Sequence, residues 1–284
     1  MTIRKTPSIK DYDRPADRIR QHRQADKRPV VILEGPSDGR LIREAFGAQL
    51  VHFPVGTRST VLSAGEQLSA WGIESFACVV DRDFDDVVST KEAAGLPIHA
   101  YENADLEAML TTIDAYRIML LELGSEEKLD RFGGLDAVTI AAQRVALPVA
   151  RLRAANCAEG WGLAFDKVDV SSKINKNSLE LNVDGYCAAL SAKSSGAPAK
   201  SVLVAWATGE RELATPPRCP RGSTPYYRGR DFLAATGVAL RSRVGSCDRA
   251  ASTAEHLSRV LRAVACQSFA ATAWGKDLSA MLAL

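Results

Sequence analysis

Three acidic side chains that follow two short apolar runs are the residues of this chain best suited to chemistry. Glu34 comes directly after the run Val30–Leu33. Asp81 and Asp83 come directly after the run Phe76–Val80. Neither run has a helical period, and uninterrupted β-branched runs of this length are typical of strands buried on both faces of a parallel sheet. We therefore expect the three carboxylates at the carboxyl edge of such a sheet, where open α/β sheets bind ligands.

Carboxylates gathered at one edge repel one another unless a cation lies between them. Hard divalent cations prefer oxygen ligands, so the sequence predicts one or two Mg²⁺ ions, with Mn²⁺ as the alternative. Asp81 and Asp83 are two residues apart, which places their side chains on one side of an extended backbone. Asp38 follows Glu34 by four residues and is expected to face the same site from the first turn of a helix, where a carboxylate also serves as a cap. Two-metal sites of this kind catalyse in-line displacement at phosphorus.

The segments that must position these residues alternate between strand and helix from Arg28 to about Tyr101. We expect strands over Val30–Leu33, Leu50–Phe53, Phe76–Val80 and Pro97–Tyr101, and helices over Asp38–Phe46 and Val61–Trp71. Strands separated by helices of this length indicate right-handed βαβ crossovers and a parallel sheet. Gly35 is expected to let the backbone turn sharply after the first strand without a Cβ clash.

The rest of the chain has mainly the periodicity of helices. We expect helices over Leu106–Leu123, with Ile118 and Leu121 on its apolar face, over Ala137–Ala155, with a kink at Pro148, and over 201–213, 230–243 and 253–283. Residues 171–178 are interpreted as a loop or short hairpin, and residues 214–229 as a loop. The predicted organisation is a basic arm of residues 1–27 that ends in a short helix over Asp17–Ala25, an α/β domain of residues 28–125, and a mostly helical region of residues 126–284.

Basic residues are concentrated in two parts of the chain, although the formal net charge is only +2. Residues 1–28 carry nine Lys or Arg against four Asp, and residues 218–249 carry seven Arg against two Asp. A basic surface beside an acidic metal site suits a phosphodiester substrate. The arginines predicted to contact nucleic acid are Arg218, Arg221, Arg228, Arg230, Arg241 and Arg243. Solvated, arginine-rich faces are the alternative interpretation.

Several other classes of protein fit the sequence poorly. The six cysteines are scattered without a CxxC pair, and the four histidines have no metal-ligand spacing, which disfavours a structural zinc site. There is no apolar stretch of transmembrane length and no signal-like segment near residue 1. We therefore expect a cytoplasmic, reduced protein that does not bind membranes. Cys78 is expected to be a small hydrophobe within a buried strand.

The order of the acidic motifs resembles that of the TOPRIM domain, which topoisomerases, primases and OLD-type nucleases share. E-G-x-x-D is matched by residues 34–38 and D-x-D by residues 81–83, within a resemblance that covers about residues 28–110. YENADLEAML, residues 101–110, is similar to a segment of small stand-alone OLD-like proteins in which an acidic residue begins a helix, and Glu107 matches that residue. YYRGRDFLAA, residues 226–235, resembles their G-[K/H]-D-L element. Arg230 stands where Lys or His is more usual, which keeps a positive charge for phosphate but removes a titratable group.

The resemblance implies both a fold and a function. The fold is a TOPRIM (Rossmann-like) α/β sheet flanked by helices, with a mainly helical C-terminal half. The function is a Mg²⁺-dependent endonuclease that cleaves tRNA or DNA. Its implied catalytic residues are Glu34, Asp81, Asp83 and Arg230, and its implied metal ligands are Glu34, Asp38, Asp81, Asp83 and Glu107.

The resemblance also implies a biological setting. Similar proteins are toxic effectors of bacterial anti-phage defence systems such as PARIS, in which they are paired with an ABC-type ATPase. The ATPase is expected to be a separate subunit, because this sequence has no G-x-x-x-x-G-K-[ST] phosphate loop. A homodimer is a further expectation.

Two other functions remain open. The chain is alternatively a non-catalytic subunit of a defence or DNA-repair complex that binds metal and nucleic acid. Topoisomerase- or primase-like activity is matched less well. Strand joining requires an active-site tyrosine in a separate domain, and Tyr226 and Tyr227 do not lie in such a context.

Overall fold

A computed structural model of the chain describes residues 14–222 and 225–284 and divides them into two compact units. The first unit consists of the described residues up to Asp81, together with Asp86–Tyr101 and Cys266–Leu284. The second consists of Arg82–Asp85 and Glu102–Ala265. The first 13 residues of the predicted basic arm lie outside the described residues. The short helix predicted at the end of the arm is confirmed as α1 (Pro15–Ala25).

The first unit contains a three-stranded parallel sheet with the order β2–β1–β3. The strands are β1 (Val30–Leu33), β2 (Val51–Pro54) and β3 (Phe76–Val79). The central strand β1 pairs in parallel with both neighbours, and every residue of β1 and β3 is buried. Burial of whole strands on both faces is what their uninterrupted apolar sequences predict.

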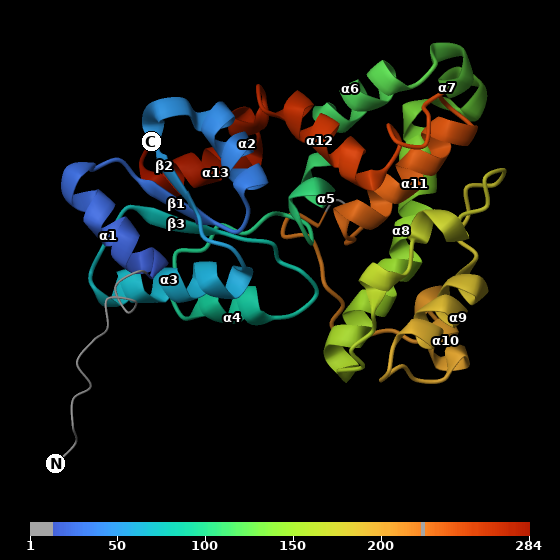
Figure 1. Cartoon of the computed structure of the whole chain (residues 1–284), viewed down its shortest axis with the longest axis horizontal. Helices are drawn as coiled ribbons and strands as arrows, with labels where there is room; N and C mark the ends of the chain where they lie inside the picture. The colour runs from blue at the N-terminus through green and yellow to red at the C-terminus, as the bar shows by residue number, and fades with distance from the viewer. Residues whose placement is uncertain (1–13, 223–224) are drawn as a thin grey trace. The chain divides into compact units, whose positions relative to one another are not determined.

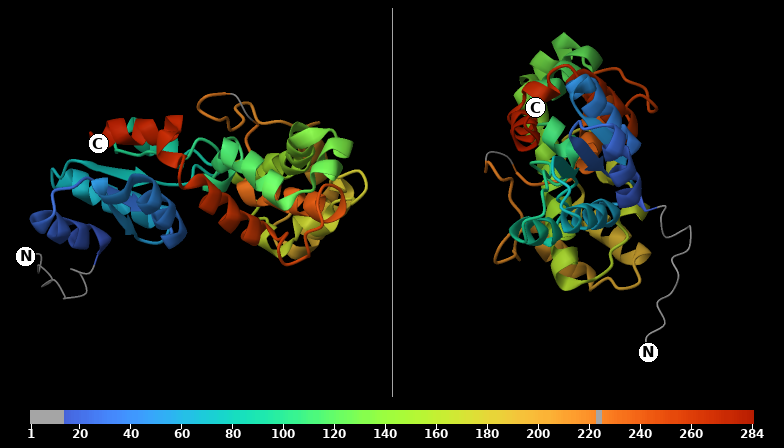
Figure 2. Two further views of the ribbon diagram at one scale, coloured as in Figure 1. Left: turned by 90° about the horizontal axis from the view of Figure 1, so that it is seen from above. Right: turned by 90° about the vertical axis from the view of Figure 1, so that its left-hand side faces the viewer.

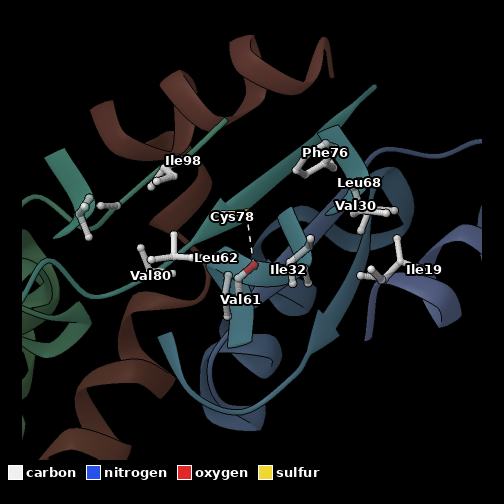
Figure 3. Packing of buried hydrophobic residues seen from close by; sticks show 14 residues of the cluster. Ile19, Val30, Ile32, Val61, Leu62, Leu68, Phe76, Cys78, Val80 and Ile98 are labelled. Carbon is white, nitrogen blue, oxygen red and sulfur yellow. Dashed lines mark hydrogen bonds between the residues drawn. The ribbon is translucent and has the colours of Figure 1, made fainter. Parts of the chain in front are cut away.

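Helices cover both faces of this sheet (Figure 1). They are α1, α2 (Pro36–Phe46), α3 (Arg58–Ala70), α4 (Val87–Ala93) and α13 (Ala273–Leu282), with short 3-10 turns η2 (Gly47–Gln49) and η5 (Phe269–Ala271). On one side, α1, α3 and α4 enclose a core that includes Ile19, Ile32, Leu68 and Cys78 (Figure 3). On the other side lie α2 and α13. Cys78 is wholly buried, as predicted.

The predicted fourth strand, Pro97–Tyr101, is wrong as a regular strand. It is reduced to a single parallel bridge between Ile98 and Cys78. A tight turn, in which the N–H of Ile98 donates to the carbonyl of Leu96 at 2.8 Å, begins the segment. Beyond it the N–H of His99 still donates to the carbonyl of Cys78 at 2.8 Å, so the segment lies along β3 without forming a regular strand. Helix α13 comes from the far end of the sequence and joins this segment through Trp274, whose Nε1 donates to the carbonyl of Ala100 at 3.0 Å.

The second unit is built from helices. They are α5 (Leu106–Leu110), α6 (Asp114–Leu123), α7 (Glu126–Phe132), α8 (Gly134–Glu159), α9 (Val183–Lys193), α10 (Lys200–Thr208), α11 (Gly229–Ser242) and α12 (Ala254–Ala265), with 3-10 turns η3 (Phe165–Lys167) and η4 (Val170–Lys173). Both α10 and α11 pack along the long helix α8, which contains Pro148 (Figures 1 and 2). No helix in the described part of the chain is long and apolar enough to cross a membrane.

The helix predicted over Leu106–Leu123 is wrong in its middle, because α5 and α6 are separate helices. The hydroxyls of Thr111 and Thr112 donate to carbonyls three residues earlier, at 2.6 and 2.7 Å. Such side-chain bonds compete with the helical backbone bonds. The break changes the buried face of α6, so Ile118 and Leu121 are 46% and 58% exposed instead of lying in the core.

Candidate functional site

Glu34 lies directly after the central strand β1, and its carboxylate joins the ends of two neighbouring strands. Its Oε1 accepts a hydrogen bond at 3.1 Å from the backbone N–H of Asp81, which follows β3. Its own carbonyl accepts the N–H of Gly56 beyond β2 at 3.0 Å. Glu34 and Asp81 are both half-buried. These bonds fix both acidic residues at the carboxyl edge of the sheet, where the sequence predicts them.

The turn after β1 does not need glycine, so the predicted role of Gly35 is wrong. Its φ of −114° and ψ of 155° are ordinary extended values. The nearest atom to a Cβ at this position would be Ser37 Oγ at 3.4 Å, which is a normal contact. Pro36 begins α2 directly after it, and its fixed φ is already suited to the first helical position.

Asp38 is held at the same edge from the first turn of α2. Its Oδ1 accepts from Ser37 Oγ at 3.2 Å, and its Oδ2 accepts from the hydroxyl of Tyr101 at 3.4 Å. The N–H of Tyr101 donates to the carbonyl of Val80 at 3.1 Å, which places this tyrosine beside the end of β3. The first unit therefore gathers Glu34, Asp38 and Asp81 at one edge of its sheet.

Asp83 belongs to the second unit, and its backbone is not extended. Its φ of 54° lies in the left-handed region, so the expectation that an extended backbone places the side chains of Asp81 and Asp83 on one side is wrong. Aspartate tolerates this conformation better than most residues do. The N–H of Asp83 donates to the carbonyl of Ala104 at 2.9 Å, and its carbonyl accepts the hydroxyl of Tyr226.

Glu107, the fifth predicted metal ligand, is bound within the second unit by residues of α12. Its Oε1 accepts from Ser258 Oγ at 2.7 Å and forms an ion pair with the guanidinium of Arg262. The carboxylate is 21% exposed. Glu107 would therefore have to exchange Arg262 for a metal ion before it could act as a ligand.

The sequence did not predict the structural role of Asn103 and Asp105. Their side chains join the segment 101–110 to the segment 226–235, the two segments similar to OLD-like proteins. Asn103 Oδ1 accepts the N–H of Tyr227 at 3.0 Å, and its Nδ2 donates to the carbonyl of Pro225 at 3.1 Å. Asp105 accepts the N–H of Gly229 at 3.0 Å. The sequence does offer one indication of this role, because an aspartate directly before a helical segment is a common helix N-cap. These bonds anchor the start of α11, which carries Arg230.

The carboxyl of Asp105 is almost entirely buried, with 6% of the residue exposed. Burial, and then the charge of Glu107, raise the pKa of Asp105 to about 7. Hydrogen bonds from the N–H groups of Ala108 and Gly229 oppose this rise, because they favour the charged form. The protonation state of this anchor therefore changes close to neutral pH.

The six predicted nucleic-acid-binding arginines do not share one surface environment. Arg221 forms an ion pair with Glu102, and Arg228 forms one with Asp166 at 3.6 Å. The structure brings two of the six together, since Arg230 and Arg241 line one pocket of the second unit. Of the remaining two, Arg218 lies exposed in the loop before α11, and Arg243 lies exposed at the end of that helix.

Asp231, next to Arg230, is not available as a charge for ligand binding. Its two oxygens accept from Nε and Nη2 of Arg153 at 2.8 and 3.2 Å. The side chains of Arg153 and Asp231 are only 12% and 5% exposed. The pair joins α8 to the first turn of α11.

Within the part of the chain that the structure describes, no three His, Cys, Asp or Glu side chains stand close enough together to hold a metal ion. No family model, no curated protein and no solved structure matches this chain. The class that the fold defines is an α/β protein with a small parallel sheet and a mostly helical remainder.

Proposed function

We propose that this chain is a Mg²⁺-dependent endonuclease with a TOPRIM-type centre at the carboxyl edge of the sheet. The observation that carries the proposal is the bond between the Glu34 carboxylate and the N–H of Asp81, which fixes acidic residues at the ends of two adjacent parallel strands. This edge is where ligands bind in open α/β sheets. The order of E-G-x-x-D and D-x-D in the sequence supports the same assignment.

The side chains at this edge suit Mg²⁺ by their chemistry. Mg²⁺ in proteins keeps several waters and is commonly bound through one or two carboxylates together with substrate phosphates. Glu34 and Asp81 are sufficient as such a pair, and Asp38 would orient one of the waters. A third close carboxylate is then not required. When bound, Mg²⁺ supplies positive charge to the phosphate and activates the attacking water.

The other predicted residues have supporting tasks in this proposal. The metal role of Asp83, whose backbone is bonded to Ala104 and Tyr226, stays a prediction from the sequence. Glu107 would take part only after release from Arg262. Arg230 would bind a phosphate of the substrate, because an arginine cannot serve as a general acid at neutral pH.

The proposed biological role is that of a toxic effector in anti-phage defence, acting in the cytoplasm with a separate ABC-type ATPase. The support is the similarity of the segments 34–38, 81–83, 101–110 and 226–235 to the small OLD-like proteins. Hydrogen bonds from the N–H groups of Tyr227 and Gly229 to Asn103 and Asp105 hold the last two of these segments together, which is consistent with a shared task.

The test is cleavage of tRNA, single-stranded DNA and duplex DNA by the purified protein with Mg²⁺ or with EDTA. The informative variant is Glu34→Gln, because its amide oxygen still accepts the N–H of Asp81 while the charge is lost. Glu44→Gln, at an exposed position of α2, is the matched control. We expect Mg²⁺-dependent cleavage by the wild type and by Glu44→Gln, and at least a hundredfold loss for Glu34→Gln. Equal cleavage by both variants, or no cleavage of any substrate by the wild type, would refute the proposal.

A non-catalytic subunit that binds metal and nucleic acid is the second candidate. It is favoured by the structural task of Glu34, whose carboxylate already stabilises the ends of β1 and β3. Calorimetric binding of Mg²⁺ that is lost in Glu34→Gln, without cleavage under any condition, would select this second function.

A further inference from the structure

The second unit contains two adjoining cavities that share four wall residues, and each has a volume of about 450 Å³. We call them together the arginine pocket. The shared residues are Asp169, Ser171, Arg241 and Arg249. Helix α11 and the turn η4 form one part of the wall, and the start of α12 forms another. Each cavity has the size of a small-ligand site.

Besides Arg153, which is paired with Asp231, five cationic side chains line the arginine pocket: Arg241 and Arg249 in both cavities, Arg230 and Lys167 in one, and Lys176 in the other. In the described part of the chain, none of these five forms an ion pair with a carboxylate. Arginines of α11 and of the loop before α12 therefore line one pair of joined, partly open cavities. Such an arrangement favours an anionic ligand.

Each acidic residue of the wall is bound by, or lies close to, another side chain. Asp231 is bound by Arg153, and Glu255 forms an ion pair with Arg259 at 2.5 Å. Asp166 is 3.6 Å from Arg228. Both oxygens of Asp169 accept from the hydroxyl of Ser171, at 2.8 and 2.9 Å. The charges of Asp231, Glu255 and Asp166 are thus offset by arginines outside the group of five, and Asp169 is the one wall carboxylate among the described residues that is held by a neutral hydroxyl.

A buried hydroxyl beside the pocket also lacks a partner. Tyr186 is completely buried, and among the described residues its hydroxyl has no hydrogen bond. It lies near enough to Arg153, Asp166 and Asp231, all of which line the pocket, for their charges to influence its pKa. A buried hydroxyl without a hydrogen bond destabilises the folded state. A water or a ligand oxygen reaching it from the pocket would recover part of this cost.

We propose that the arginine pocket binds phosphate esters and holds the backbone of a nucleic acid strand. Arginine matches phosphate oxygens in a bidentate way, and Arg241 and Arg249 stand where the two cavities join. Because two cavities are joined, the pocket suits two consecutive phosphates of a strand better than one isolated phosphate. That the ligand is a nucleic acid strand rests on the proposed nuclease function. The binding of phosphate esters itself requires no cleavage.

The experiment is fluorescence anisotropy of a labelled ten-nucleotide single strand, in EDTA so that no cleavage occurs, over a series of salt concentrations. The test variant is the double substitution Arg241→Gln and Arg249→Gln. The control is Arg144→Gln with Arg211→Gln, which removes the same charge from exposed positions of the second unit outside the pocket. Circular dichroism and thermal unfolding confirm that both variants fold.

We expect the test variant to bind the strand at least tenfold more weakly than the wild type, and the control less than threefold. The slope of log affinity against log salt should fall by about 1.4 in the test variant, since each phosphate contact to a single strand contributes about 0.7. Competition by a nucleoside monophosphate at micromolar concentration would identify a single phosphate ester as the ligand, and competition only by strands would identify the backbone. Equal affinities of the two variants, or no binding by the wild type, would overturn the proposal.

The proposed nuclease function and the proposed strand binding are tested separately. Strand binding is measured in EDTA, so it does not depend on the carboxylates that would bind Mg²⁺. If strand binding depends on Arg241 and Arg249 but no cleavage is found, the pocket stands and the nuclease function does not.

Discussion

The buried carboxyl of Asp105 should make the stability of the protein depend on pH, and Asp105→Asn should remove that dependence. Asp105 accepts the N–H groups of Ala108 at 2.8 Å and Gly229 at 3.0 Å through Oδ1. Asparagine offers the same carbonyl oxygen without the charge. Because Asp105 anchors the start of α11, this substitution also tests how the segment that carries Arg230 is held.

The sign and size of the effect follow from the pKa. The ordinary value of 3.8 is raised to about 7 by burial and by the charge of Glu107. Below pH 3.8 the carboxyl is protonated in both states. As the pH rises to 7, the folded state retains a proton that the unfolded state has lost, so the free energy of unfolding decreases. A shift of about 3 pH units corresponds to at most about 4 kcal/mol.

The measurement is urea unfolding between pH 4 and pH 8 for the wild type, Asp105→Asn and the exposed control Asp130→Asn on α7. Between pH 4 and pH 8, the free energy of unfolding of the wild type should fall by about 2–4 kcal/mol relative to that of Asp105→Asn. The control should follow the wild type. Parallel curves for the wild type and Asp105→Asn, or a difference that grows in favour of the wild type with rising pH, would refute the reasoning.

Three further substitutions test the packing of α11: Gly229→Ala and Asp231→Ala change its first turn, and Gly35→Ala is the control for adding a Cβ to a glycine. A Cβ at Gly229 would lie 2.3 Å from the backbone nitrogen of Ala108, so Gly229→Ala should lower the free energy of unfolding by about 3 kcal/mol. Gly35→Ala should cost less than about 1 kcal/mol, because its Cβ would meet only an ordinary contact; urea unfolding distinguishes the two. Asp231→Ala leaves the guanidinium of Arg153 buried without its partner and should cost about 3–5 kcal/mol, whereas a loss below 1 kcal/mol in thermal unfolding would contradict the importance of this ion pair.

The sheet and its acidic edge could be predicted because the signals are local. The run Val30–Leu33 is apolar at every position, and β1 is accordingly buried on both faces. A charged residue that follows such a strand must leave the core, so the position of Glu34 at the edge follows from the sequence alone. The same reasoning locates Asp81 after β3.

The contacts between distant segments could not be predicted in this way. The periodicity of residues 253–283 indicates helices but does not identify what they pack against, and Trp274 binds the carbonyl of a residue 174 positions earlier. The ion pair between Glu107 and Arg262 likewise joins α5 to α12. A carboxylate near a helix start looks the same in sequence whether it binds a metal or an arginine.

The clustering of arginines along the sequence predicts the basic surface only in part. The arginine-rich segment 218–249 predicted one basic surface, but Arg221 and Arg228 are engaged with carboxylates. The arginine pocket combines Arg230 and Arg241 with Lys167 and Lys176, which lie outside that segment. Only the fold of the second unit brings these residues together.

The central claim is that carboxylates at the edge of the sheet bind Mg²⁺ for phosphodiester cleavage. Its most direct test is the Mg²⁺ concentration that gives half-maximal cleavage, measured for the wild type and for Asp81→Asn. We predict that Asp81→Asn requires at least tenfold more Mg²⁺, because a neutral amide is a weaker ligand than a carboxylate. An identical Mg²⁺ dependence in the two proteins, or cleavage that is insensitive to Mg²⁺, would contradict the account.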